Sequence, residues 1–197
     1  MIRIVVTSLV VFLACLSHAW GAGDPERGKE KAIVCIGCHG VDGNSLHVAY
    51  PKLAGQLEGY IFKQTLDFKE GRRKDAVMSG MISVMPDEDD LKDIAAYYAS
   101  QETMQGPNRD SDLIKEGEEI FVRERCHFCH GRRGKNQSSL ATPPAIIGGQ
   151  HKQYLVKSLN DIRDGHRTGD MYGLMVQALN RLSTEEVLAV CEYLSNQ

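Results

Sequence analysis

The sequence contains no apolar run long enough to cross a membrane. Its longest run, residues 4–16, has thirteen residues, whereas a membrane-spanning helix needs roughly 20. Alternating runs of β-branched residues, which strands require, are missing as well. Positive charge is not in excess, because 23 Lys and Arg stand against 26 Asp and Glu. These absences predict a soluble, all-α protein with no nucleic-acid partner.

The N-terminus has the pattern of a secretory signal peptide. A basic residue in the first three positions is followed by the apolar run and then by small residues in "SHAWGAGD". We therefore predict that residues 1–21 contain a signal peptide for export to the periplasm, which is cleaved after Ala19 or Gly21. Anchoring as a lipoprotein at Cys15 is disfavoured, because the apolar segment before it is short.

The remaining chain is an internal duplication. "CIGCH" at 35–39 recurs as "CHFCH" at 126–130. "AGQLEGYIFKQTLDFKEGRR", which begins at Ala54, matches "GGQHKQYLVKSLNDIRDGHR", which begins at Gly148, at an offset of 94 residues. The polar segment 104–112 between the copies contains Gly and Pro and predicts a linker.

Helical patterns open and close the copies. The sequence Asp24-Pro25-Glu26 predicts a helix start, and Ser183 to Glu186 is typical of a capping box, of which Asp87 to Asp90 is a weaker version. Apolar stripes predict a closing helix in each copy: Leu91, Ile94, Ala95 and Tyr98 in the first, and Val187, Val190, Cys191 and Leu194 in the second. Cys191 has no partner in this pattern, so we expect a buried, inert thiol. We expect two tandem all-α domains, 22–103 and 113–197.

The CxxCH pattern is typical of haem c attachment. Its two thiols add to the haem vinyl groups as thioethers, and its histidine is the proximal iron ligand. A zinc site shared between the copies is disfavoured because the CxxC pairs are 91 residues apart. A disulfide within each pair would leave both histidines without a role. The sequence predicts two covalently bound haem c groups, at Cys35, Cys38 and His39 and at Cys126, Cys129 and His130.

Methionine is the expected ligand on the other side of each iron, because its thioether favours the ferrous state. The candidates are Met78, Met81 and Met85 in the first copy and Met171 and Met175 in the second. At an offset of 97 residues Met78 aligns with Met175, whereas Met81 aligns with Ala178 and Met85 with Leu182. We therefore predict Met78 and Met175, and Met85 as a core residue. His47, His151 and His166 have no histidine counterpart and are expected at the surface.

Together these segments resemble the cytochrome c4 family, over essentially the whole mature chain. The motifs that carry the likeness are "CIGCHGVDGNS", "PKLAGQ", "YIFKQTLDFKEGRR" and "MSGM" in the first copy, with "CHFCHG", "GGQHKQYLVKSL" and "DGHRTGD" in the second. The resemblance implies two fused cytochrome c domains, each with His and Met on iron: His39 with Met78, and His130 with Met175. It also implies a proline whose carbonyl accepts a hydrogen bond from the proximal histidine. Pro51 fits that role, and Pro144 fits it less well because it lies one residue further from its "GGQ".

We expect an electron carrier and not an enzyme, because two axial ligands leave no open position on either iron. The expected partners are redox proteins: a quinol-oxidising complex or another donor, and a terminal oxidase as acceptor, with any membrane association peripheral. One alternative is a cytochrome subunit of a flavin-dependent sulfide dehydrogenase or other periplasmic oxidoreductase, which would have a stable partner chain. A dihaem peroxidase is disfavoured, since it needs one iron without a strong sixth ligand.

The charge of the two copies differs. Residues 24–103 carry 10 basic and 14 acidic residues, whereas residues 104–197 carry 12 of each. Negative surroundings stabilise the ferric state, so the N-terminal haem is expected to have the lower potential.

Overall fold

The computed structural model describes residues 23–85, 87–135, 144–169 and 171–197. Within these residues the chain is helical, and its extended pairing is limited to an isolated β-bridge between Arg73 and Arg167. The predicted signal peptide, with Cys15 and both candidate cleavage sites, lies outside the described residues.

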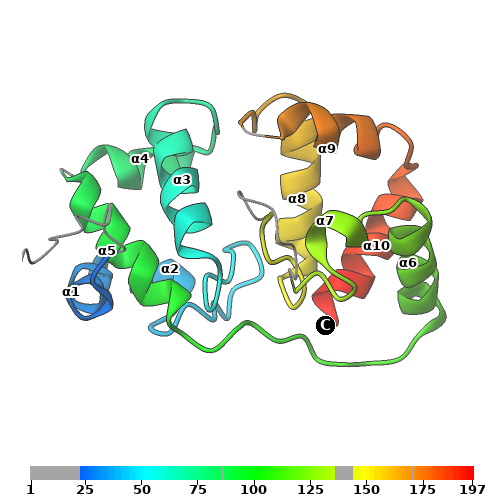
Figure 1. Cartoon of the computed structure of the whole chain (residues 1–197), viewed down its shortest axis with the longest axis horizontal. Coiled ribbons are helices and arrows are strands. Elements are labelled where there is room, and N and C mark those ends of the chain that lie inside the picture. Colours follow the sequence, from blue (N-terminus) through cyan, green and yellow to red (C-terminus); the bar gives the residue numbers. More distant parts are fainter. Residues whose placement is uncertain (1–22, 86, 136–143, 170) are drawn as a thin grey trace, which may run out of the picture.

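The helices of the described residues form two groups of five that follow the duplicated sequence (Figure 1). The first group lies on the left of the view and the second on the right, and the segment between them runs along the bottom. The first group is α1 (Pro25–Lys31), α2 (Ile33–His39), α3 (Glu58–Lys69), α4 (Ala76–Ser83) and α5 (Glu88–Ala99). The second is α6 (Asp112–Arg123), α7 (His127–His130), α8 (Lys152–Arg163), α9 (Tyr172–Leu179) and α10 (Thr184–Ser195). The predicted fold class, two all-α domains related by duplication, is confirmed.

The helix starts lie where the capping residues predict them. The Asp24 side chain accepts hydrogen bonds from two N–H groups in the first turn of α1, and a proline is the first helical residue. Ser183 and Glu186 form the capping box of α10. Asp87 caps α5 by accepting a hydrogen bond from the N–H of Asp89. Each closing helix is therefore fixed at its N-terminus by its own sequence.

In each domain the first and last helices cross at a glycine. A Cβ on Gly28 of α1 would come within 1.9 Å of the Asp93 carbonyl oxygen in α5. Gly117 of α6 takes the same place against α10, where a Cβ would come within 2.1 Å of the Ala189 carbonyl oxygen. Glycine permits this close approach of two backbones. Both copies have kept the helix pair that supports the domain.

The predicted apolar stripes of α5 and α10 are buried and close the two cores. Tyr98 and Cys191 are both 0% exposed. Burial raises the pKa of the Cys191 thiol to about 12, which agrees with the expected inert thiol. The C-terminal core is one cluster that includes Phe121. The N-terminal core is divided into two clusters, and Met85 packs against both, as its prediction as a core residue requires.

The domains meet through reciprocal contacts. Arg73 donates a hydrogen bond to the Tyr154 hydroxyl at 2.6 Å, and Arg167 donates to the Tyr60 hydroxyl. Both the arginines and the tyrosines are related by the offset of 94 residues. The domain contact therefore has approximate two-fold symmetry, like the isologous interface of a dimer.

The segment predicted as a linker is held against both domains. Its first residue, Met104, is 0% exposed. The Met104 N–H donates to the Ala54 carbonyl at 3.2 Å, and Lys135 donates to the Met104 carbonyl. Residues 104–111 are not helical, and α6 begins at Asp112.

Candidate haem-binding sites

The two CxxCH patterns lie on equivalent short helices. Cys35 and Cys38 are on α2, and Cys129 is on α7, with Cys126 at its N-terminal boundary. A spacing of three residues on a helical turn brings the two sulfurs of each pair to one side of the helix. All four thiols are half-buried and free. Burial raises the pKa of Cys35 and of Cys126 to about 11, so these two thiols are protonated at neutral pH.

His39 ends α2, and its ring is buried. Its Nδ1 lies 2.9 Å from the carbonyl oxygen of Pro51. A carbonyl can only accept, so Nδ1 carries the proton and Nε2 is the ring nitrogen left for a metal. Burial lowers the pKa of the ring, which favours the neutral form that binds metals. The role that the resemblance gives to Pro51 is confirmed by this geometry.

His130 has the same arrangement with a different acceptor. Its Nδ1 lies 3.1 Å from the carbonyl oxygen of Ala145, and burial lowers the pKa of this ring too. The resemblance implied the carbonyl of Pro144 as this acceptor, with a weaker fit than Pro51. The acceptor is instead the carbonyl of the next residue, Ala145. The offset of 94 residues brings Ala145 onto the position of Pro51. Every residue has a backbone carbonyl, so register along the loop decides the acceptor and the residue type does not.

Apart from Met85, which packs in the core, the candidate methionines differ in exposure. Met78 of α4 and Met175 of α9 are half-buried. The alternatives Met81 and Met171 are 37% and 48% exposed. Within each pair, Met78 and Met175 are thus the less exposed residues.

Helix register relates these two methionines to each other. Met78 stands four residues before Ile82, the buried residue of α4, and Met175 stands four residues before Leu179, the buried residue of α9. A spacing of four places two side chains on one helix face. Both methionines therefore share a face with the residue that anchors their helix, at the offset of 97 residues on which their prediction rests.

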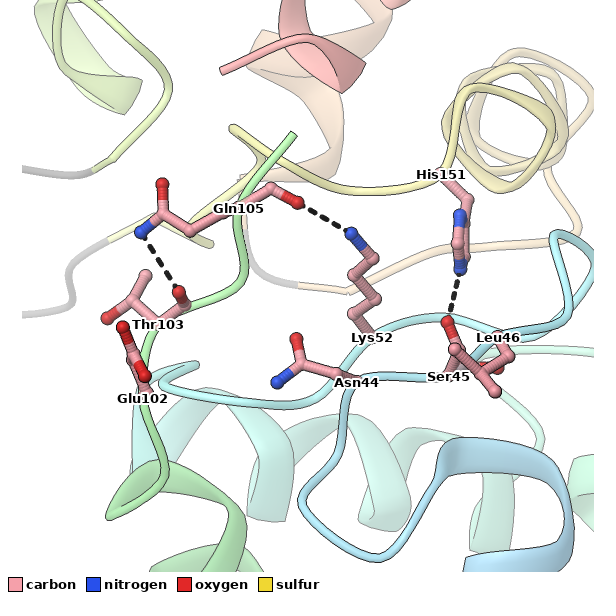
Figure 2. Close-up of a pocket in the computed structure, with 8 residues that line it drawn as sticks. All are labelled: Asn44, Ser45, Leu46, Lys52, Glu102, Thr103, Gln105 and His151. Carbon is pink, nitrogen blue, oxygen red and sulfur yellow. Dashed lines mark hydrogen bonds between the residues drawn. The ribbon is translucent and has the colours of Figure 1, made fainter. Parts of the chain in front are cut away.

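The other histidines do not gather at these sites. His47 and His166 are exposed, as predicted. His151, also expected at the surface, is half-buried, and its Nε2 lies 2.8 Å from the Ser45 carbonyl oxygen of the other domain (Figure 2). Beside it a cavity of about 450 Å³ lies between the domains, and Lys52 reaches across to the backbone of the connecting segment there. His151 thus serves the contact between the domains, which its lack of a histidine counterpart did not reveal.

Two further polar residues near the sites were not singled out from the sequence. Gln56 and Gln150 are buried at the domain contact. The signal that marks them is the Gly-Gln pair, which repeats at the offset of 94 residues immediately before α3 and α8.

The donor set of each copy fits haem c. Two free thiols on one helical turn suit two thioether bonds, and an imidazole whose Nδ1–H is engaged presents Nε2 to iron. A half-buried thioether on a separate helix supplies a soft sixth donor.

The Cytochrome c family model matches residues 25–102 and 114–197, which are the two copies. Cytochrome c4 of Pseudomonas aeruginosa is 38% identical over 195 residues, covering 95% of this chain and 95% of that protein.

The chain belongs to the cytochrome c4 family.

Two further comparisons agree with this membership. The crystal structure of reduced recombinant cytochrome c4 from Pseudomonas stutzeri matches with a TM-score of 0.76 and 36% identity, over 89% of this chain and 99% of that one. A protein of Stutzerimonas stutzeri named thiosulfate dehydrogenase electron acceptor is 34% identical over 84% of this chain and 79% of its own length.

Membership establishes the cofactor and the class of activity. The protein carries two covalently bound haem c groups, one in each cytochrome c domain, and it transfers electrons without being an enzyme. In the part of the chain that the structure describes, no helix combines the length and the apolar character needed to span a membrane.

Proposed function

We propose that the protein carries single electrons through a periplasmic respiratory chain, from a quinol-oxidising complex or another donor to a terminal oxidase. The signal peptide within residues 1–21 directs it to that compartment and is cleaved after Ala19 or Gly21. Any membrane association is peripheral, through its partners. The haems are attached at Cys35 and Cys38 and at Cys126 and Cys129, and the irons are held by His39 with Met78 and by His130 with Met175.

The observation that carries the proposal is one ligand geometry repeated in two copies. In both copies the histidine that follows the second cysteine donates its Nδ1–H to a backbone carbonyl, at 2.9 Å for His39 and 3.1 Å for His130. Such a bond fixes the ring orientation and increases its donation to iron. Two sites prepared in the same way support a chain that holds two electrons, one on each haem.

Two axial protein ligands on each iron suit electron transfer. With His and Met in place, oxygen or peroxide has no open coordination position. The protein must therefore keep the geometry of these ligands fixed while the charge of the iron changes. Buried, hydrogen-bonded imidazoles suit this requirement, because they need no rearrangement between the two oxidation states.

The terminal oxidase assignment is tested with membranes of the source organism. The reduced, purified protein should be reoxidised by these membranes in the presence of oxygen, and cyanide, which blocks haem–copper oxidases, should stop the reaction. Reoxidation that cyanide leaves unchanged would contradict this acceptor.

Mass spectrometry of the exported protein checks the compartment, since the mature chain should begin after Ala19 or Gly21.

A second candidate function is electron acceptance from a periplasmic oxidoreductase, such as a thiosulfate dehydrogenase or a flavin-dependent sulfide dehydrogenase. The relatives named thiosulfate dehydrogenase electron acceptor, at 34% and 31% identity, favour it. Affinity purification from the native periplasm distinguishes the two functions. A stable partner chain that reduces the haems when given thiosulfate or sulfide supports this candidate, whereas a protein recovered alone supports the diffusing carrier.

A further inference from the structure

Two buried glutamines join the domains beside the proximal histidines. Gln56 is 5% exposed and Gln150 is 4% exposed. Each side chain forms two hydrogen bonds with the backbone of a single residue in the opposite domain. A buried amide that loses its partners costs about 1–3 kcal/mol, so both glutamines are held firmly in these positions.

The two contacts have the same pattern in opposite directions between the domains. The Lys52 N–H donates to Gln150 Oε1 at 2.9 Å, and Gln150 Nε2 donates to the Lys52 carbonyl at 2.9 Å. In the other direction, the Ile146 N–H donates to Gln56 Oε1 at 2.9 Å, and Gln56 Nε2 donates to the Ile146 carbonyl at 2.7 Å. Lys52 and Ile146 are related by the same 94 residues as the two glutamines.

In the N-terminal domain, one peptide group connects the glutamine to the histidine. The Pro51 carbonyl and the Lys52 N–H belong to the same planar amide. Its oxygen accepts from His39 Nδ1 at 2.9 Å, and its N–H donates to Gln150 Oε1 at 2.9 Å. A continuous chain of hydrogen bonds therefore runs from the His39 ring, through one peptide, to a side chain of the C-terminal domain.

The C-terminal domain has the same chain in the opposite direction. The carbonyl of Ala145 accepts from His130 Nδ1 at 3.1 Å. The N–H of that peptide, which belongs to Ile146, donates to Gln56 Oε1 at 2.9 Å. The chain of hydrogen bonds that begins at the histidine of each domain thus ends at a glutamine of the other domain.

Such a chain affects the electron donation of the imidazole. A peptide that donates at its N–H becomes a better acceptor at its carbonyl, because linked hydrogen bonds strengthen each other by about 10–30% per bond. A stronger acceptor draws the Nδ1 proton and makes Nε2 more basic. A more basic ligand stabilises the ferric iron and lowers the potential.

We propose that Gln150 and Gln56 are positioning residues that tune each haem from the opposite domain, Gln150 through His39 and Gln56 through His130. This inference rests on the proposed function, because it takes these histidines as the proximal ligands. It makes the potential of each haem depend on an intact contact between the domains.

Isosteric variants test the proposal in the full-length, haem-loaded protein. Gln150→Met and Gln56→Met keep the side-chain volume and remove both hydrogen bonds to the opposite domain. They also remove the bond that each Oε1 accepts from the N–H of the next residue, His151 or Leu57. Gln64→Met is the matched control. Gln64 is a glutamine of the same contact that accepts from Arg73 and Arg167 at 2.9 Å, and these bonds do not involve a peptide that holds a histidine. Far-UV circular dichroism against temperature checks that each variant folds.

A spectroscopic redox titration gives the decisive readout. Gln150→Met should raise the potential of the haem on Cys35 and Cys38 and leave the other wave in place. Gln56→Met should raise the potential of the haem on Cys126 and Cys129 alone. Gln64→Met should leave the difference between the potentials of the two haems unchanged.

A conservative variant supplies a rescue. Gln150→Glu keeps an oxygen that accepts from the Lys52 N–H, so the potential of the N-terminal haem should return to the wild-type value or fall below it. Gln150→Asn, whose shorter side chain cannot make both contacts, should act like Gln150→Met and carries the test if the Met variant does not fold. A potential in Gln150→Glu as high as that of Gln150→Met would overturn the role of the acceptor oxygen.

The pattern of the shifts separates tuning from a purely structural role. Equal shifts of both waves, a shift of the haem in the variant's own domain, or no shift would overturn the proposal. Failure of the underlying ligand assignment is recognised in an otherwise wild-type chain, where Met78→His and Met175→His must each move a single wave. These two variants also identify which wave belongs to which haem.

Discussion

Asp93 of α5 and Ala189 of α10 occupy the same place at the helix crossing of their domains, opposite Gly28 and Gly117. Asp93 is 2% exposed and accepts hydrogen bonds from the Asp24 N–H at 2.7 Å and from a guanidinium and an ammonium group of α1, each at 2.9 Å. In the C-terminal domain the corresponding residue, Ala189, is 1% exposed and belongs to one continuous core cluster. The N-terminal crossing thus has a buried carboxylate where the C-terminal crossing has a small apolar residue, and the ion pair of the C-terminal crossing, Arg123 with Glu186, is more exposed.

The histidines have not diverged in this way. His39 and His130 both keep the bond from Nδ1 to a carbonyl, and both keep the glutamine from the opposite domain beyond it. The contacts that orient the two proposed iron ligands have thus been preserved through the duplication, whereas the contacts that hold the scaffold have changed. The two domains should therefore respond alike to changes at the proposed ligands and differently to changes in the scaffold.

The largest effect should come from removal of a ligand. Met175→Ala should abolish the absorption of the oxidised protein at about 695 nm for one haem, open that iron to added ligands and lower its potential, because the soft sixth donor is lost. Met78→Ala should do the same to the other haem. The neighbouring variants Met171→Ala and Met81→Ala are the controls and should leave the band in place. An exchange of these outcomes within either domain would refute the register between α4 and α9.

The next effect concerns the charged helix crossing. Asp93→Ala should lower the free energy of unfolding of the N-terminal domain by about 2 kcal/mol, because hydrogen bonds to a charged group contribute about 1.5–3 kcal/mol. Urea unfolding of the haem-loaded protein measures it. Asp89→Ala, on the same helix, removes a carboxylate that is 76% exposed and should lower the free energy of unfolding by clearly less. Equal costs for the two variants would contradict a special role of the buried carboxylate.

The same carboxylate should make the domains unequal in acid. Hydrogen bonds from Arg27 and from the Asp24 N–H hold the pKa of Asp93 well below its usual range. A depressed pKa stabilises the folded state above the unfolded value of about 3.9, and this stabilisation is lost as the pH falls through the folded value. Hydrogen exchange read by mass spectrometry should show that α1 and α5 lose protection before α6 and α10 as the pH falls below about 4. Asp93→Asn should remove that pH-dependent difference, and simultaneous loss in the wild type would count against it.

The smallest effect should be the difference in potential that arises from surface charge. The N-terminal half carries four more acidic than basic residues and the C-terminal half carries equal numbers, so the N-terminal haem should have the lower potential. Electrons would then settle on the C-terminal haem. Exposed charges are screened beyond about 8–10 Å, so the difference should shrink at high salt. Titration at low and high ionic strength, with Met78→His and Met175→His to assign the waves, measures it, and a higher potential for the haem on Cys35 and Cys38 would refute it.

The parts of the fold that depend on local sequence were predictable. The cap at Asp24, the box from Ser183 to Glu186 and the buried stripes of α5 and α10 each follow from residues a few positions apart. The haem-attachment pattern is local in the same way. Duplication added information that one copy lacks, because it singled out Met78 and Met175 among several methionines.

The features that escaped prediction depend on contacts between distant residues. The acceptor of the His130 proton is Ala145, because loop register decides which carbonyl faces the ring. His151 is half-buried at the domain contact, and Asp93 is buried among cations although it stands in a strongly acidic helix. Neither environment can be read from periodicity, since each is created by a partner more than 60 residues away in the chain.

Electron transfer by this protein depends most directly on two His–Met haems in one chain. The measurement that tests it is a haem count per chain by mass spectrometry, joined to the amplitude of the band at about 695 nm in the oxidised, exported protein. The expected result is two covalently attached haems per chain and a band amplitude that corresponds to methionine on both irons. A single haem, or two haems with the band of only one, would contradict it.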